Sequence, residues 1–414
     1  MLPLTLLFLV LLLAGTALKL WLALRQRQAV RAGRTRVPVP FDARVTLEEH
    51  HKAADYTLAC GRLGIVEILI DAALVLGWTL GGGLDLLDRL WSAAGLPPVA
   101  TGTAVMMSVL VLMSVLSLPF SIYRTFVVEE RFGFNRTTPG LFVVDQIKGL
   151  VLLLLLGTPL VLLVLWLMRT AGAAWWLYAW LAWVAFTLVL TWAFPTLIAP
   201  LFNKFTPLAD AALRERIEAL LERCGFHSKG IFVMDGSRRS GHGNAYFTGL
   251  GNAKRIVFFD TLIESLEPVE IEAVLAHELG HFRRKHVRKR LALAVALAFA
   301  GFALLGWLVG TTWFYAALGV QPSPHMALLL FMLVAPVFTF PLTPLGSWLS
   351  RRHEFEADAY AVAQADGRSL AQALVKLYRD NATTLTPDPL HSTFYDSHPP
   401  APIRVARLAS LSAR

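Results

Sequence analysis

The sequence predicts an all-α-dominated polytopic membrane protein with seven transmembrane helices and a cytoplasmic α+β part that bears a small sheet. Of its 414 residues 56% are hydrophobic and only 16% are charged, whereas soluble domains carry about 25% charged residues. Its apolar residues gather in runs of about 20 residues or more, long enough to cross roughly 30 Å of hydrocarbon as a helix. The seven runs are 3–24, 63–83, 102–122, 149–168, 173–202, 291–317 and 326–349.

The first run is expected to remain in the membrane as an anchor with its N-terminus outside. A secretory signal carries basic residues before its apolar segment, but here the basic cluster Arg25–Arg36 follows Leu4–Leu24. Loop charges agree, because eight basic residues separate the first two runs and four separate the third and fourth, against at most one in each alternate loop. Loops rich in basic residues stay in the cytoplasm.

The cysteine count and the net charge limit which metal ligands and which partners the protein can have. The two cysteines, Cys60 and Cys224, are too few for a disulfide framework and have no metal-ligand spacing. Any metal would therefore be bound by histidines and carboxylates. The net charge of +9 is expected to orient loops, and no nucleic-acid binding is predicted because no soluble module carries a basic stripe with aromatic residues.

Orientation and hydropathy divide the chain into four parts. They are a five-helix N-terminal membrane region (1–202), a cytoplasmic catalytic part (203–290), transmembrane helices six and seven (291–349) and a cytoplasmic C-terminal part (350–414).

Residues 203–290 are expected to form the α+β part. Residues 208–225 predict an amphipathic helix with Leu213, Ile217, Leu220 and Leu221 on one face. Pro268 opens a second helix, which is expected to run on through residue 290 into the sixth span. Three β-type segments lie between the helices, with a turn at Gly249, Gly251 and Asn252: Ile231–Met234, Asn244–Thr248 and Ile256–Phe259.

The helix that starts at Pro268 contains His277-Glu278-Leu279-Gly280-His281. Histidines four residues apart leave the same helical face, so both imidazoles can bind one cation. Glu278 lies beside them, where its carboxylate can take a proton from water at the metal. This spacing is typical of zincins, which obtain two ligands and a general base from one helical turn. A pair of surface histidines near a basic membrane edge is the alternative interpretation.

A catalytic zinc needs a third protein ligand and an open position. The segment Glu354-Phe355-Glu356-Ala357-Asp358 follows the seventh span on the same side of the membrane. Glu354 and Asp358 share a helical face, so Glu354 is expected to be the ligand and Asp358 to orient a ligand histidine, while Glu356 points elsewhere. The spacing alone leaves open solvated carboxylates that pair with Arg351 or Arg352.

Three further features carry hypotheses. Asn244-Ala245-Tyr246-Phe247 is expected to be an edge strand that pairs with substrate backbone, although an inner strand fits the pattern too. Glu67 and Asp71 lie four apart inside the second span. Carboxylates at membrane depth usually face protein or water, so they are expected to line an aqueous chamber unless Glu67 lies at headgroup level. The basic stretch 283–290 is expected to contact anionic headgroups.

From about residue 120 onward the chain resembles the type I CAAX prenyl endopeptidases, integral-membrane zinc metalloproteases of the gluzincin type. Seven spans together with the order of the motifs make this resemblance specific. The motifs are Glu130–Asn135, Asp145–Lys148, Pro200–Phe205, Asn244–Phe247, the HELGH pentad, Glu354 with Asp358, Ser397–Pro399 and Arg404.

The resemblance implies one zinc ion per chain, bound by His277, His281 and Glu354. It implies that Glu278 is the general base and that His398 and Arg404 lie near the zinc and stabilise the oxyanion. It also implies seven helices around a large water-filled chamber, and the eukaryotic relatives cut prenylated CAAX proteins. The Ala/Leu/Arg-rich composition suggests a bacterial source, and hence the bacterial cytoplasmic membrane.

The predicted function is therefore a zinc-dependent integral-membrane endopeptidase that acts on a peptide or protein substrate, with isoprenylated peptides as one candidate. The first alternative is a membrane protein quality-control metalloprotease. The second is a seven-helix transporter or scaffold with a regulatory zinc site, although the internal repeat usual in transporters is not visible. The sequence predicts no particular oligomeric state.

Overall fold

Apolar helices of membrane-spanning length dominate the computed structural model, which describes residues 3–226, 228–248 and 255–412. Within these residues six continuous helical segments can cross a membrane by length and composition, and a bent helix pair makes a seventh. The predicted fold class is confirmed. The continuous segments contain α1 (Pro3–Gly33), α4 (Pro98–Tyr123), α5 (Pro139–Thr170), α6 (Trp175–Ala193), α11 (His286–Leu308), and α13 (Pro324–Thr339) followed by α14 (Thr343–Gln364).

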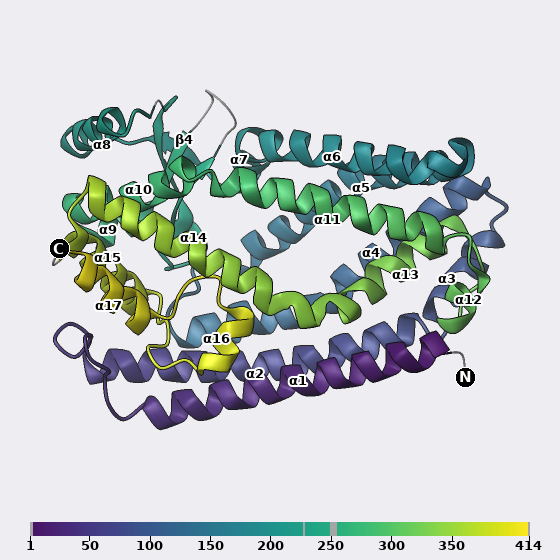
Figure 1. The fold of residues 1–414 in the computed structure, drawn as a ribbon, viewed down its shortest axis with the longest axis horizontal. Helices are drawn as coiled ribbons and strands as arrows, with labels where there is room; N and C mark the ends of the chain where they lie inside the picture. The colour runs from purple at the N-terminus through teal and green to yellow at the C-terminus, as the bar shows by residue number, and fades with distance from the viewer. Residues whose placement is uncertain (1–2, 227, 249–254, 413–414) are drawn as a thin grey trace.

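Exposed leucines on these helices explain why they need a bilayer. Leu13 on α1, Leu155 on α5 and Leu297 on α11 have 63%, 65% and 64% of their surface accessible. Large apolar patches of this kind are rare on soluble monomers. In Figure 1 the long helices run along the longest axis of the molecule, with α1 and α2 side by side, and the two termini lie at opposite ends.

The second span is bent, whereas the sequence predicted one apolar run over 63–83. Helix α2 (Leu47–Trp78) and helix α3 (Gly83–Ser92) meet at 47° across a short break. Gly82 in the break has a φ of 78°, in the left-handed region that glycine adopts without steric cost. The continuous helix of this span therefore ends at Trp78, before the predicted boundary at residue 83.

The helix that carries the HELGH pentad does not continue into the sixth span. Helix α10 ends at Arg283 (Pro268–Arg283), and α11 starts at His286. Between them Lys285 has a φ of 58°, which ends one helix and redirects the next. The sixth span also ends earlier than predicted, at Leu308, because Thr312–Ala317 forms the separate helix α12.

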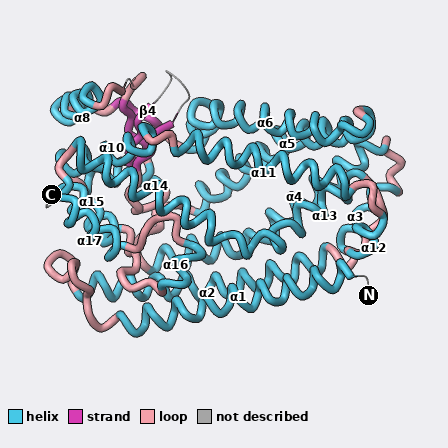
Figure 2. The backbone as a smooth tube through the Cα atoms, viewed as in Figure 1, coloured by secondary structure: helices cyan, strands magenta, loops and turns pink. Residues whose placement is uncertain are grey.

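A four-stranded sheet lies at one end of the helical bundle (Figure 2). Its strands are β1 (Phe205–Pro207), β2 (Ile231–Met234), β3 (Ala245–Thr248) and β4 (Arg255–Phe259), in the order β1-β2-β4-β3. Strands β2 and β4 are parallel, and the two outer pairs are antiparallel. The three predicted strands are confirmed and β3 lies at an edge, but β1 was not predicted. The predicted turn at Gly249, Gly251 and Asn252 lies outside the described residues.

The sheet packs with helices that are close in space but distant in sequence. Helix α8 (Ala211–Arg223) buries its four predicted apolar residues against α10. The far end of α14 packs beside α10, so the seventh span delivers its last turns to this core. Further helices at this end include α7 (Ala199–Phe202), α9 (Asp260–Ser265), α15 (Gly367–Asp380) and α17 (Ala401–Ser412). Helix α16 (Pro389–Tyr395) packs against α14 and α1.

Glu67 and Asp71 on α2 have different surroundings. Both Glu67 carboxylate oxygens accept hydrogen bonds from Arg124 Nη2 at 3.0 Å. Glu67 therefore faces protein, as a carboxylate at this depth requires. Asp71 has an exposed side chain, and its place in an aqueous chamber stays a prediction.

Candidate metal centre

His277 and His281 lie on the most deeply buried helix of the extramembrane part. Helix α10 starts with Pro268 at its first position and with reciprocal capping bonds between Glu267 and Glu270. Its next residues are buried almost without interruption up to Gly280. The two imidazoles leave one face, and their Nε2 atoms are 3.1 Å apart.

Glu354 of α14 completes a three-atom cluster with these histidines. Its Oε2 lies 3.4 Å from His277 Nε2, and its Oε1 lies 3.2 Å from His281 Nε2. Tetrahedral zinc with bonds of about 2.0–2.1 Å places its ligand atoms roughly 3.3 Å apart. Two imidazole nitrogens and a carboxylate oxygen are a donor set that suits zinc. These residues therefore fit the metal in both spacing and chemistry.

Asp358 and Arg404 surround the other side of His277. Asp358 Oδ1 lies 2.8 Å from His277 Nδ1, the nitrogen that does not face Glu354. Arg404 Nε and Nη2 donate to the two Asp358 oxygens at 2.9 and 2.7 Å, and Nη1 lies 3.4 Å from Glu354 Oε2. The side chains of His277, Asp358 and Arg404 are each at least 93% buried, so their charges act in a low-dielectric setting.

The neighbours of His277 shift the pKa of its imidazole. Burial and the nearby Arg404 charge lower the pKa of His277, but its hydrogen bonds to Asp358 and Glu354 outweigh them and raise that pKa to about 9. A cation at this site therefore has to displace a proton from the imidazole at neutral pH.

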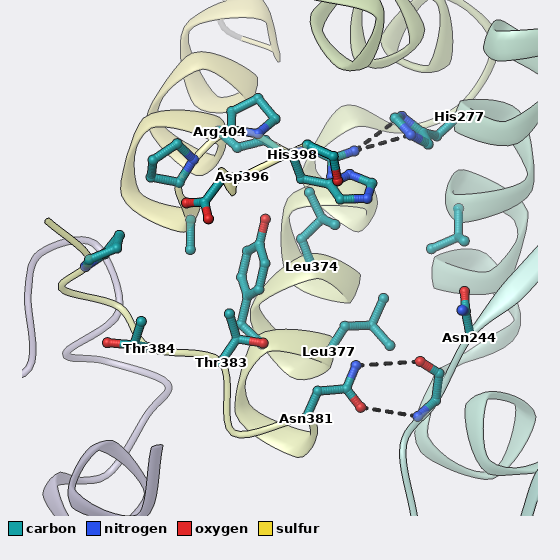
Figure 3. A pocket seen from close by; sticks show the side chains of 18 of the residues that line it. Asn244, His277, Leu374, Leu377, Asn381, Thr383, Thr384, Asp396, His398 and Arg404 are labelled. Carbon is teal, nitrogen blue, oxygen red and sulfur yellow. Dashed lines mark hydrogen bonds between the residues drawn. The ribbon is translucent and has the colours of Figure 1, made fainter. Parts of the chain in front are cut away.

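Glu278 and His398 face a cavity of about 500 Å³ next to the three-atom cluster. The Glu278 side chain is half-buried and has no ion-pair partner among the described residues. His398 comes from the segment before α17; its side chain is 62% exposed, and Nδ1 lies 2.8 Å from Glu354 Oε2. Figure 3 shows His398 and Arg404 on the same side of the cavity as His277. The structure thus brings together all the predicted residues of the metal centre.

The predicted substrate strand is divided between cavity and core. Asn244 and Ala245 line the cavity, and Asn244 is drawn at its wall in Figure 3. Phe247 packs edge-to-face with Phe226 in the core below the sheet, and Tyr246 lies against Met234. Only the first half of the motif therefore lines this cavity.

Two polar contacts of this site were missed from the sequence. Asn381, just after α15, accepts from Gly243 N and donates to Gly243 O at 3.1 and 3.3 Å, directly before β3 (Figure 3). His286 lies 3.0 Å from His281 through their Nδ1 atoms. His286 belongs to the basic stretch 283–290, and its contact with His281 joins two separate helices, so helical spacing within one segment does not indicate it.

The remaining carboxylate of the acidic motif lies as predicted. Glu356 points away from Glu354 and contacts His286 and Arg352. The alternative pairing of Glu354 with neighbouring arginines is not present in the described contacts. Arg352 pairs with Glu356, and Arg351 donates to the backbone carbonyl of Ser392 in α16 and to that of Asp396, directly after this helix.

A membrane-spanning helical bundle whose α+β end presents a His-Glu-x-x-His helix, with a carboxylate from another helix as the third candidate ligand, defines a membrane metallopeptidase of the zincin class. Two family descriptions match the chain: CAAX prenyl protease N-terminal, five membrane helices, over residues 26–204, and peptidase family M48 over residues 207–412. The chain belongs to the CAAX prenyl protease family of M48 peptidases, which are zinc metallopeptidases of membranes that hydrolyse peptide bonds.

Individual relatives match nearly end to end. CAAX prenyl protease 1 homolog of Arabidopsis thaliana is 36% identical, with 92% of this chain and 91% of that protein aligned. CAAX prenyl protease 1 of Saccharomyces cerevisiae is 35% identical over 94% of this chain and 92% of that protein. The crystal structure of S. mikatae Ste24p superposes with a TM-score of 0.91 at 31% identity and covers 99% of both chains.

Proposed function

We propose that this peptidase works through one zinc ion bound by His277, His281 and Glu354. The observation that carries the proposal is the convergence of two imidazole nitrogens, 3.1 Å apart, on one carboxylate, whose oxygens lie 3.2 Å from His281 Nε2 and 3.4 Å from His277 Nε2. Zinc bound there supplies a Lewis acid that polarises the scissile carbonyl and makes water more acidic. The other residues bind, orient and move protons around this point.

Glu278 is proposed to be the general base and later the general acid. Its carboxylate lies on the cavity wall next to His277 and is not held in an ion pair by the described residues. It can therefore take a proton from the attacking water and pass it to the leaving amine. A carboxylate locked in a salt bridge would be a poorer base.

His398 and Arg404 are proposed to stabilise the oxyanion in different ways. His398 is largely exposed to the cavity, so its imidazole can turn toward a substrate oxygen. Arg404 is held by Asp358 and approaches His277 and Glu354. Its charge strengthens the positive field at the site, while its hydrogen bonds keep Asp358 in place to orient His277.

Substrate backbone is proposed to pair with the free edge of β3. Among the residues that the structure describes, this strand has one neighbour, β4, and its first residue lines the cavity together with Asn244. Pairing of this kind binds extended peptides with little dependence on their side chains. Leu374 and Leu377 face the same cavity from α15 and offer an apolar wall for a substrate side chain.

An isoprenylated peptide is the first candidate substrate, because the relatives that match nearly end to end are named CAAX prenyl proteases. A second cavity supports it. This cavity holds about 1200 Å³ between the membrane helices and is lined almost wholly by apolar residues, including Met106, Leu160 and Phe331. Membrane protein quality control is the second candidate function, favoured by the sequence-tolerant strand edge. We infer a bacterial inner membrane from the composition.

The site is proposed to face the cytoplasm. Arg25, in the basic cluster that ends α1, forms a two-point ion pair with Asp388 of the segment that leads to His398. This contact supports a metal centre on the side of the membrane that carries the basic loops, which we expect to be the cytoplasmic side. The N-terminus would then lie outside.

The decisive experiment compares wild-type protein with Glu278→Gln and His281→Ala in detergent. Zinc content is measured by elemental analysis, and cleavage is measured with fluorogenic farnesylated and unmodified peptides. We expect Glu278→Gln to keep one zinc per chain and lose about 10²–10⁴-fold in turnover. We expect His281→Ala to lose the metal itself. Wild-type protein without metal, or full turnover in Glu278→Gln, would overturn the assignment.

A further inference from the structure

Each histidine of the metal centre has a partner for the nitrogen that faces away from Glu354. For His277 this partner is the carboxylate of Asp358. For His281 it is the ring of His286, whose Nδ1 lies 3.0 Å from His281 Nδ1. His286 in turn places its Nε2 3.2 Å from Glu356 Oε2, and Arg352 Nε donates to Glu356 Oε1 at 3.2 Å.

We propose that His286 and Glu356 are positioning residues that fix the tautomer and ring orientation of His281 for metal binding. This inference rests on the metal site proposed above. His286 and Glu356 form an imidazole–carboxylate pair that supports the reaction. Neither side chain would touch the metal, and both would act on it through His281.

Three side chains, His281, His286 and Glu356, form a hydrogen-bonded line, and the proton positions along it follow from the contacts. If His281 binds a metal through Nε2, its proton must lie on Nδ1, because a neutral imidazole carries one N–H. His286 Nδ1 must then accept that hydrogen bond, so the proton of His286 lies on Nε2. Nε2–H points at Glu356 Oε2, which accepts it. Every donor on this line therefore faces an acceptor. If one imidazole carried its proton on the other nitrogen, two donors or two acceptors would face each other.

The backbone is shaped to make this contact. Had α10 continued, His286 would lie five residues beyond His281 and about 140° around the helix from it. The left-handed Lys285 instead starts a new helix and turns His286 back to His281. His286 is 1% exposed, and the ring of His353 stacks on it with centroids 4.0 Å apart and planes inclined by 14°. Its ring therefore has little freedom to rotate.

This line connects the metal centre to two membrane-spanning segments. His286 is the first residue of α11, and Glu356 lies on the continuation of the seventh span, α14. The orientation of His281 thus depends on how these two helices sit relative to each other. The HELGH helix does not determine it alone.

Metal affinity tests the inference directly. Full-length protein in detergent is titrated with zinc against a chromophoric chelator. We expect His286→Phe, which keeps a ring to stack on His353 but offers no acceptor, to bind zinc about 10–100-fold more weakly, as is usual for loss of such a partner. We expect His286→Asn to recover most of the affinity, because its amide oxygen can accept from His281 Nδ1–H.

A second pair of variants tests Glu356, the residue of this line that lies farthest from the metal site. Glu356→Ala removes the acceptor of His286 Nε2–H and should weaken zinc binding, whereas Glu356→Gln keeps an acceptor oxygen and should restore it. Cobalt-loaded protein gives a spectroscopic check, because its visible absorption reports ligand geometry, and His286→Phe should shift that spectrum. His353→Phe is the matched control, since it keeps the stack and should leave affinity unchanged.

Distinct results separate this inference from the proposed metal site. If wild-type protein binds zinc and a folded His286→Phe variant binds it equally well, with an unshifted cobalt spectrum, the positioning role is wrong while the metal site stands. If wild-type protein binds no zinc, the metal site itself is wrong. Thermal unfolding of the metal-free variants establishes folding. If His286→Phe does not fold, equal zinc affinities of Glu356→Ala and wild type would overturn the inference.

Discussion

Gly280 and Ala357 bring helices α10 and α14 into backbone contact. A methyl group built on Gly280 would lie 2.9 Å from both the Cα and the carbonyl oxygen of Ala357. Contacts this short do not occur, so only glycine permits the observed approach. The approach matters because His277 and His281 lie on one of these helices and Glu354 on the other.

Replacing Gly280 by alanine should therefore weaken metal binding. Overpacking costs about 1–3 kcal/mol, and alanine recovers about 1 kcal/mol of it through its higher helix propensity. The net change in stability is expected to be small, while the displacement of α14 separates Glu354 from the histidines. Zinc affinity and thermal unfolding, measured on the same sample, distinguish the two effects. Gly346→Ala is the control, because its methyl would meet no atom within 4 Å; equal zinc affinity in both variants would contradict the prediction.

Asn381→Ala should impair substrate binding more than turnover. The amide of Asn381 makes two hydrogen bonds to the backbone of Gly243 and so fixes the start of β3. Without them the strand edge loses part of its order, and each lost bond costs about 0.5–1.5 kcal/mol. We expect KM to rise several-fold with kcat nearly unchanged. Asn381→Asp keeps the acceptor for Gly243 N and should fall in between; a lowered kcat at constant KM would argue for a different role.

Acid should destabilise the attachment of α16 to α1 through Asp388. The ion pair with Arg25 and the backbone hydrogen bonds of the helix cap outweigh burial and hold the pKa of Asp388 below its ordinary value. A carboxyl group with a depressed folded-state pKa contributes stability above its unfolded value of about 3.9 and loses it as pH falls toward the folded value. Asp388→Asn should cost about 1–3 kcal/mol at pH 7 and less as pH drops below 4.

Unfolding midpoints of the wild type and Asp388→Asn, measured from pH 7 down to pH 3, provide the comparison. The gap between the two proteins should narrow with acid. A gap that stays constant over this range would show that the charge of Asp388 contributes nothing to the attachment.

Asp71 should be accessible to water from inside the membrane region. In a cysteine-free background, Asp71→Cys is expected to react with a membrane-impermeant thiol reagent in the folded protein. Leu155→Cys, on the lipid-facing surface of α5, should stay unlabelled. Absence of labelling at position 71 would exclude an aqueous chamber there and leave Asp71 at a protein or lipid contact.

Local pattern was enough for much of the architecture. The seven spans follow from runs of apolar residues, and the paired histidines follow from helical spacing, since both depend only on neighbours in the chain. The features that the sequence did not predict also have local causes. The bend at Gly82 and the break at Lys285 interrupt segments whose composition is continuous, and strand β1 has only three residues, too few for an alternating pattern.

The sequence by itself determined the class of membrane protein, the ligand pair His277 and His281, and the acidic motif on the same side of the bilayer. Tertiary structure decided how far apart these groups lie and what supports them. Glu356 meets His286 across 70 residues, and Asn381 meets Gly243 across 138. Nothing in the residues next to either partner encodes such a meeting, because it results from packing between helices and strands that the chain brings together only when it folds.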